Sequence, residues 1–251
     1  MDLTLVIPCF DEGARIDACL ESVTGWVDER KAMSCEVLVV DDGSTDDTAL
    51  RAKAWAARRP DVRVLEAPTN AGKGDAVRRG VLEARGDIVV FLDADLAVPV
   101  DHVESVLPAL RDGVDVAVGC RHVPGAAVEK PQGPLRRTLG RGYLVLARWL
   151  LDIPVSDVTC GFKGFRRRVA QELFDGARCR RWGFDAEILH LAARRNYKVL
   201  EVPVAWRDGA ESRVRLPRDL LGSFAELAAV RWRSSTGAYG PPAPPGTRGP
   251  R

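Results

Sequence analysis

The sequence has no uninterrupted apolar run approaching ~18 residues, the length that a membrane-spanning helix requires. Its amino terminus also lacks the features of a signal peptide, because an acid at position 2 leads directly into the strand-like segment Leu3-Thr4-Leu5-Val6-Ile7. The six cysteines form no C-x-x-C pair, which argues against a zinc site or a disulfide framework. We therefore expect a cytoplasmic protein whose cysteines are reduced and lie in or near the core.

Aromatic residues are also scarce, at 6% of the 251 residues, and most fall within apolar patterns. Because nucleic-acid binding needs aromatic and basic residues interleaved on one face, we expect no nucleic-acid partner. The net charge of +2 hides an asymmetry. Residues 1–129 hold 14 Lys and Arg against 24 Asp and Glu, a net charge of −10, and residues 130–251 hold 23 against 11, a net charge of +12. The acidic half can hold a cation, and the basic half an anion or an anionic membrane face.

What the chain does contain is a regular alternation of strand and helix signals, typical of parallel βαβ units. We predict strands at 3–8, 36–41, 62–66, 87–92, 114–119 and 199–205, and helices at 13–26, 46–59, 74–85, 101–111, 135–151, 182–195 and 216–233. The Pro- and Gly-containing residues 121–134 predict a mobile loop beside the site. We expect one α/β domain with a mainly parallel sheet over residues 1–235, followed by a disordered tail over residues 236–251.

Asp93-Ala94-Asp95 follows the buried strand predicted at 87–92. Two carboxylates separated by one small residue suit Mg²⁺ or Mn²⁺ bridging to a diphosphate. Taken alone, the triplet is more often a solvated turn. Three other predicted strands also end in polar clusters, however, and α/β folds bind their ligands at the carboxyl ends of their strands. We therefore predict a metal site at Asp93 and Asp95.

The other three clusters complete a nucleoside-diphosphate site. Pro8-Cys9-Phe10-Asp11-Glu12 follows the first strand. Asp41 and Asp42 follow the second strand and can accept hydrogen bonds from a nucleobase or ribose, the alternative being that they cap the next helix. Lys73 lies in the glycine-containing turn 70–74 that opens a helix, where it can hold a phosphate, although the turn matches neither a Walker loop nor G-x-G-x-x-G. The residues predicted to bind the nucleotide sugar are Pro8, Phe10, Glu12, Asp41, Asp42, Lys73, Asp93 and Ala94.

The segment 41–46, Asp-Asp-Gly-Ser-Thr-Asp, and the triplet 93–95 together resemble the signature of the family 2 glycosyltransferases, which have the GT-A nucleotide-sugar fold. Segments 157–165, 181–189, 202–206 and 211–213 resemble the polyprenyl-phosphate sugar synthases, and the dolichyl-phosphate glucosyltransferase branch most of all. The resemblance covers about residues 2–235. It implies inverting transfer of a hexose from a nucleotide sugar of the UDP-glucose or GDP-mannose class to polyprenyl phosphate, with Mg²⁺ or Mn²⁺ as cofactor. Ala97 stands where mannosyl-phosphate synthases usually carry Gln, which favours glucose over mannose, and Arg213 replaces a common Lys.

The resemblance also implies catalytic roles, which we assign to Asp185, Asp95 and Arg213. Asp185 lies where inverting family members place their catalytic base. If the acceptor is a hydroxyl, Asp185 should take its proton. If the acceptor is a lipid phosphate, it needs no base, and arginine side chains should hold it. The candidates for this acceptor site are Arg121, Arg137, Arg141 and Arg213, with a solvated helix face as the alternative for Arg137 and Arg141.

Two other functions stay open at this point. The first is transfer to a hydroxyl acceptor with Asp185 as general base. The second is a non-catalytic module that binds a nucleotide sugar or another anion, which would release no UDP or GDP. The basic half and the apolar stripes of the helices predicted at 135–151 and 216–233 also lead us to expect peripheral contact with the cytoplasmic membrane face. The alternative is that these stripes are buried in the core.

Overall fold

The computed structural model describes residues 1–130, 134–207 and 218–243. Over these residues the main sheet has seven strands in the order β3-β2-β1-β4-β7-β5-β8. Its parallel neighbours are β1 (Leu3–Cys9), β2 (Cys35–Asp41), β3 (Val62–Glu66) and β4 (Ile88–Leu92) on one side, and β5 (Val116–Cys120) and β8 (Val199–Pro203) on the other. Between them, β7 (Phe162–Arg166) runs antiparallel to both β4 and β5. A second, two-stranded sheet pairs β6 (Ala127–Lys130) with β9 (Ala205–Arg207).

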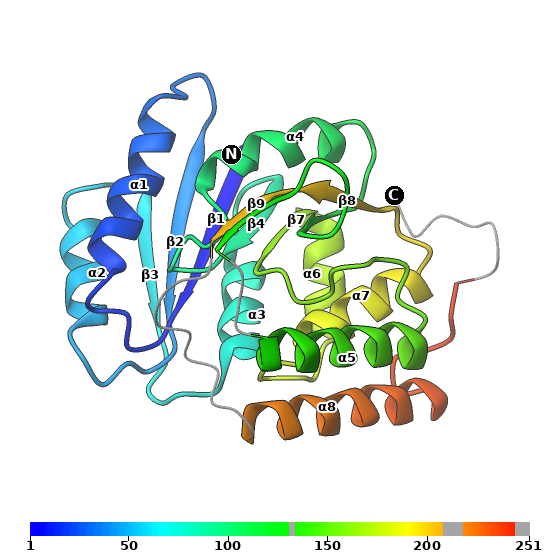
Figure 1. The fold of residues 1–251 in the computed structure, drawn as a ribbon. Helices are drawn as coiled ribbons and strands as arrows, with labels where there is room; N and C mark the ends of the chain where they lie inside the picture. The colour runs from blue at the N-terminus through cyan, green and yellow to red at the C-terminus, as the bar shows by residue number, and fades with distance from the viewer. Residues whose placement is uncertain (131–133, 208–217, 244–251) are drawn as a thin grey trace.

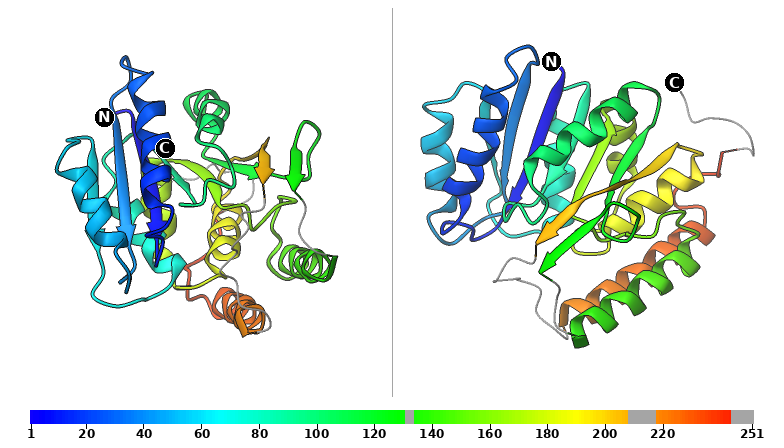
Figure 2. Two further views of the ribbon diagram at one scale, coloured as in Figure 1. Left: turned by 60° about the vertical axis from the view of Figure 1, so that its left-hand side comes forward. Right: turned by 45° about the horizontal axis from the view of Figure 1, so that its top comes forward.

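Helices cover both faces of the main sheet and make a layered α/β/α arrangement (Figure 1). One face packs against α1 (Ile16–Asp28), α2 (Thr48–Ala56), the 3₁₀ turn η1 (Val100–His102) and α4 (Val103–Arg111). The other face packs against α3 (Lys73–Glu83), α6 (Arg167–Gly176) and α7 (Phe184–Arg194). Outside that layer, α5 (Pro134–Leu151) and α8 (Arg218–Ser235) lie side by side (Figure 2).

The strands are apolar on both faces because helices cover both. In β1, Leu3, Leu5 and Ile7 join the core under α1 and α4, whereas Val6 joins the core under α3, α6 and α7. The register pairs Cys9 of β1 with Asp41 of β2, and Val6 of β1 with Phe91 of β4. The residues that follow β1, β2 and β4 therefore leave the sheet at one edge, as the sequence predicted.

The mainly parallel α/β sheet is confirmed, and the predicted strands and helices fall within a few residues of the observed ones. The predicted helix 101–111 is divided between η1 and α4, and the predicted strand 199–205 between β8 and β9. The sequence interpretation missed β7 and α6. It also expected a loop over 121–134, where the structure places β6 at Ala127–Lys130, and residues 131–133 lie outside the described part.

The first residues of the expected disordered tail contact α7. The Tyr239 hydroxyl donates to Glu187, the Arg194 guanidinium donates to the Gly240 carbonyl at 2.8 Å, and the Ala243 amide donates to the Arg194 carbonyl at 2.9 Å. Side chains and backbone of α7 thus hold residues 239–243 by hydrogen bonds, although this segment has no apolar pattern of its own. Residues 244–251 lie outside the described residues.

Two further expectations concern cysteines and membrane spans. All six cysteines are buried free thiols. Among the helices that the structure describes, none is long and apolar enough to cross a membrane.

Candidate active site

The loop after β1 is tied to the loop after β2. The Asp11 carboxylate accepts from the Thr45 amide at 2.7 Å, and the Asp11 amide donates to the Ser44 hydroxyl at 2.9 Å. Glu12 forms an ion pair with Arg15 at 3.0 Å. Pro8 and Phe10 are half-buried between these contacts and solvent. The predicted first and second clusters therefore form one wall of the site.

The two acids at the end of β2, its last residue Asp41 and the following Asp42, are both buried but have different partners. Asp41 accepts from the Ser44 amide at 3.1 Å and from the Ser44 hydroxyl. Asp42 accepts from the Ala71 amide at 3.0 Å and the Gly72 amide at 2.7 Å, so it fixes the turn that opens α3. Burial raises the pKa of Asp42, and these two backbone hydrogen bonds oppose the shift. The role of Asp41 and Asp42 in binding a nucleobase or ribose stays a prediction.

The side chain of Lys73, the first residue of α3, points towards Asp93, one of the two carboxylates predicted to bind a metal. Its Nζ lies 2.6 Å from Asp93 Oδ1 and 5.6 Å from the centroid of the Trp182 ring. Burial alone would lower the pKa of Lys73, but the charges of Asp93 and Asp185 outweigh it and raise the pKa. Gly72 precedes this lysine with φ of +110°, and a Cβ there would lie 2.5 Å from the Arg180 carbonyl oxygen. Glycine thus lets the start of α3 pack against the segment that leads into α7.

Asp93 and Asp95 follow β4, with the small residue Ala94 buried between them. The Asp95 carboxylate accepts from the Ala97 amide at 3.0 Å. Although Asp95 is exposed on one side, desolvation by the surrounding protein, together with the charge of Asp93, raises the pKa of its carboxyl. Over residues 1–130, 134–207 and 218–243, no cluster of three or more His, Cys, Asp or Glu gathers that could hold a metal alone. The two carboxylates fit a hard divalent cation that takes its remaining oxygens from a bound diphosphate.

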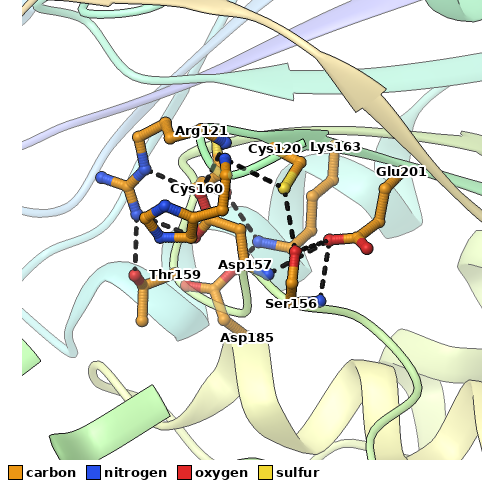
Figure 3. A network of polar contacts seen from close by, with 10 residues as sticks. Cys120, Arg121, Ser156, Asp157, Thr159, Cys160, Lys163, Asp185 and Glu201 are labelled. Carbon is orange, nitrogen blue, oxygen red and sulfur yellow. Dashed lines mark hydrogen bonds and ion pairs between the residues drawn. The ribbon is translucent and has the colours of Figure 1, made fainter. Parts of the chain in front are cut away.

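Asp185 lies in the first turn of α7 and forms a buried ion pair. Its Oδ1 lies 2.5 Å from Lys163 Nζ on β7, and this nitrogen also donates to the Cys160 carbonyl at 2.7 Å (Figure 3). The Asp185 side chain is only 8% exposed. Burial raises the pKa of Asp185, while the charges of Lys163 and Lys73 oppose the shift. Asp185 is therefore held in one orientation close to Lys73.

The four candidate acceptor arginines are placed very differently. Arg121 directly follows β5 and pairs with the buried Asp157 at 2.7 Å. Arg141 is exposed on α5 and lines a surface groove with Val145 and Trp149. Arg137 lies within α5, but its side chain is outside the described part, and Arg213 is outside it altogether. The acceptor roles of all four arginines stay predictions.

A five-residue segment between α5 and β7, the segment 157–161, contacts Arg121, Lys163 and Asp93. Asp157 and Thr159 hold Arg121, and the Cys160 carbonyl accepts from Lys163. A Cβ at Gly161 would lie 1.9 Å from Asp93 Oδ2, so only glycine allows this approach. The sequence interpretation assigned no site role to Asp157 or Lys163. A lysine inside Phe162-Lys163-Gly164-Phe165, an otherwise apolar run, was the available signal for a buried ion pair.

Comparison with known proteins decides the family. The family described as glycosyl transferase family 2 matches residues 4–174 of the chain. The chain belongs to this family. The GT-A fold expected for it is supported by the crystal structure of glucosyl-3-phosphoglycerate synthase from Mycobacterium tuberculosis with UDP, which matches with a TM-score of 0.66, 24% identity, and coverage of 92% of this chain and 80% of that one. The predictions of a family 2 glycosyltransferase and of its fold are confirmed.

Two relatives extend the similarity beyond the part that the family match covers. Dolichyl-phosphate beta-glucosyltransferase ALG5C of Trichomonas vaginalis is 34% identical over 85% of this chain and 66% of its own length. Dolichyl-phosphate beta-glucosyltransferase of Dictyostelium discoideum is 30% identical over 94% of this chain and 76% of its own length. The chain thus spans from about two thirds to three quarters of the length of these relatives.

Proposed function

We propose that this glycosyltransferase moves glucose, with inversion, from a nucleoside-diphosphate sugar of the UDP-glucose class to a polyprenyl phosphate. The observation that carries the proposal is the similarity, at 30–34% identity over 85–94% of the chain, to enzymes named dolichyl-phosphate beta-glucosyltransferases. This similarity continues past residue 174, where the family match ends, into the part of the chain that holds Asp185 and the predicted acceptor residue Arg213.

The donor side of the proposed reaction is the edge formed by the ends of β1, β2 and β4. Asp93 and Asp95 would hold a divalent cation, Mg²⁺ or Mn²⁺, which supplies charge neutralisation for the leaving diphosphate. Lys73, at the amino end of α3, would add a positive charge to the same group. Lys73 Nζ lies 2.6 Å from Asp93 Oδ1, so a cation on Asp93 and a diphosphate beside Lys73 would take the place of this ion pair.

On the acceptor side, a phosphate oxygen of the lipid forms a bond to the anomeric carbon of the sugar. The bond from that carbon to the β-phosphate oxygen breaks on the opposite face, and its electron pair leaves with the nucleoside diphosphate. The phosphate nucleophile already carries its charge, so no proton has to be removed. Of the predicted acceptor arginines whose side chains the structure describes, Arg121 and Arg141, we take Arg121 to hold this anion, because it lies at the end of β5 and its side chain is 17% exposed.

A second candidate function, transfer to a hydroxyl acceptor, is favoured by one observation. Burial raises the pKa of Asp185, and a raised pKa suits a general base. Against it, Asp185 Oδ1 is already engaged by Lys163 at 2.5 Å. In the polyprenyl-phosphate reaction the same ion pair has a different role, since it fixes the start of α7 beside Lys73.

We also propose that the paired helices α5 and α8 touch an anionic membrane surface. Trp149 on α5 is 76% exposed and Trp232 on α8 is 66% exposed. Basic residues on the same helices include Arg141 and Arg148 of α5 and Arg231 of α8. Exposed tryptophans next to basic side chains favour binding at a lipid interface, where a polyprenyl phosphate would be found.

The decisive experiment is a matrix of UDP- and GDP-sugars against polyprenyl phosphate, with and without Mn²⁺ or Mg²⁺. We expect release of UDP from UDP-glucose that depends on both the lipid phosphate and the metal. Release that depends instead on a hydroxyl acceptor would support the second candidate. A protein that binds the nucleotide sugar without any release, whichever acceptor is added, would contradict both.

A further inference from the structure

The Arg121 guanidinium is held along one edge by a single carboxylate. Its Nε donates to Asp157 Oδ2 at 2.7 Å and its Nη2 donates to Asp157 Oδ1 at 2.8 Å (Figure 3). The Arg121 amide donates to the same Oδ2 at 3.0 Å, and Nη2 also donates to the Thr159 hydroxyl at 3.0 Å. A planar guanidinium bound by two parallel hydrogen bonds has a fixed orientation.

This arrangement leaves one edge of the guanidinium available. Within the residues that the structure describes, Nη1 of Arg121 has no hydrogen-bond partner. The Trp206 ring, with its centroid 5.3 Å from the Arg121 guanidinium carbon, covers part of the group. Arg121 thus presents one pair of N–H groups, in a set direction, to a ligand that carries acceptor oxygens.

Asp157 is itself fixed by the edge strand β8. Glu201 Oε1 accepts from the Ser156 amide at 2.8 Å, from the Ser156 hydroxyl at 2.7 Å and from the Asp157 amide at 3.2 Å. Glu201 lies opposite Val118 of β5 in the sheet. The Asp157 side chain is 0% exposed, and Arg121 is its charged partner. Three hydrogen bonds accepted by a sheet residue therefore fix Ser156 and the backbone of Asp157, which carries the carboxylate that holds Arg121.

The same segment connects Arg121 to the rest of the site. The Cys160 carbonyl binds Lys163, which pairs with Asp185, and Gly161 packs against Asp93. An arginine held on this segment keeps a set position relative to the donor side of the reaction. An arginine without Asp157 would sample many rotamers, and it would have to be ordered each time an acceptor binds.

We propose that Asp157 is a positioning residue for the acceptor step, which acts by aiming the free edge of Arg121 at the acceptor phosphate. The proposal rests on the proposed function, because it takes Arg121 as an acceptor ligand. Asp157 does not contact the acceptor itself. Its removal should therefore weaken acceptor binding only through Arg121.

The test compares Asp157→Asn, Arg121→Ala and the double variant, with UDP-glucose as donor and undecaprenyl phosphate in detergent micelles as acceptor. We expect Asp157→Asn to raise the acceptor KM by about 10- to 100-fold, because a charge-assisted contact that holds Arg121 is lost. The donor KM should stay within about twofold. In the Arg121→Ala background, Asp157→Asn should add nothing to the acceptor KM, since residues acting through one group are not additive.

Matched controls separate positioning from simple loss of stability. Glu36→Gln removes another buried acid that pairs with an arginine, Arg63, at the start of β2, the opposite edge of the sheet. It should lower thermal stability without changing either KM. If Asp157→Asn does not fold, Thr159→Val decides, because Thr159 is exposed and, within the described part of the chain, its hydroxyl hydrogen-bonds only to the Arg121 guanidinium. It should raise the acceptor KM about two- to tenfold, whereas Thr236→Val at the end of α8 should not.

The possible outcomes are distinct. If the wild-type protein transfers nothing to undecaprenyl phosphate, the proposed function fails and this inference falls with it. If the wild type is active but Arg121→Ala is not impaired, Arg121 is not an acceptor ligand and the inference is wrong. If Arg121→Ala raises the acceptor KM, three results would still overturn the inference. Asp157→Asn could leave the acceptor KM unchanged, or it could raise the donor KM as much as the acceptor KM. Asp157→Asn could also raise the acceptor KM further in the Arg121→Ala background.

Discussion

The proposed donor side and the proposed acceptor side of the site hold their charges in different ways. On the donor side, Asp93 and Asp95 follow a parallel strand, and Asp93 has a partly exposed lysine as its partner. On the acceptor side, Asp185 and Asp157 are 8% and 0% exposed and are paired with Lys163 and Arg121. The donor carboxylates can exchange partners when a cation and a diphosphate bind. The acceptor-side ion pairs are built into the fold, and they fix direction more than they supply free charge.

The largest effect should come from a donor-side carboxylate. Asp95→Asn removes the charge of one predicted metal ligand at an exposed strand end, so we expect turnover to fall by at least about 10³-fold. The thermal midpoint should change little, because Asp95 makes one short-range hydrogen bond to Ala97. Turnover is measured with Mg²⁺ and with Mn²⁺, beside a thermal melt. Near wild-type turnover in either metal would show that Asp95 is not a ligand.

Asp185 should be less sensitive than Asp95 if the acceptor is a phosphate. Loss of a general base costs about 10²–10⁴-fold, whereas Asp185→Asn should cost less than about 10² because the nucleophile is already charged. The same change leaves Lys163 buried without its partner, which we expect to reduce stability by about 3–5 kcal/mol. Activity must therefore be measured well below the melting midpoint of the variant.

The comparison with Arg121→Ala and Arg213→Ala completes this test. For a phosphate acceptor, the arginine variants should show lower kcat/KM for the lipid, because a charge-assisted contact is lost. The double variant Lys163→Met with Asp185→Asn removes both charges and so controls for the unpaired lysine. If Asp185→Asn loses kcat/KM by the full amount expected for a general base while Arg121→Ala and Arg213→Ala keep wild-type values, the polyprenyl-phosphate proposal is wrong and a hydroxyl acceptor is favoured.

How much of the site the sequence could predict follows from the same contrast. The position of the donor-side residues could be predicted because hydrophobic runs identify the strands in the sequence. Parallel strands then bring the residues that follow them to one edge of the sheet. The positions of Asp41, Lys73 and Asp93 at this edge were predicted in this way, and their roles in binding stay predictions. On the acceptor side Arg121 and Asp185 were predicted from the family resemblance, but their partners Asp157 and Lys163 were not, because β7 is antiparallel and its Lys163 and Gly164 interrupt the apolar pattern. The partner of Lys163 is 22 residues away and that of Arg121 is 36 residues away, so only the fold brings these pairs together.

A glycine tests the junction between the two sides. A Cβ at Gly161 would lie 1.9 Å from Asp93 Oδ2, so Gly161→Ala must displace the Asp93 carboxylate or the segment 157–161. We expect the donor KM and the metal concentration needed for half-maximal activity to rise about tenfold, equal to about 1.4 kcal/mol. The matched control is Gly25→Ala within α1, where nothing lies within 4 Å of the added carbon. The control should leave both parameters unchanged and gain about 0.5–1 kcal/mol of stability. Equal donor KM values for the two variants would mean that the segment does not constrain Asp93.

The smallest expected effect concerns the surface of the acceptor side. Each basic side chain near an anionic leaflet contributes about 1 kcal/mol, and this contribution is screened by salt. We therefore expect the protein to sediment with liposomes that contain anionic lipid at low salt and to be released at high salt. Trp149→Ala and Trp232→Ala should each weaken this binding severalfold, because both side chains are exposed on the paired helices.

Leu50→Ala is the matched control, since Leu50 is 70% exposed on α2, in the helix layer on the opposite face of the main sheet. If the apolar side chains of α5 and α8 only pack in the core, the wild-type protein will stay in the supernatant even at low salt, and the proposed membrane contact is wrong. If the tryptophan variants and Leu50→Ala lose binding equally, the contact is not made by these helices.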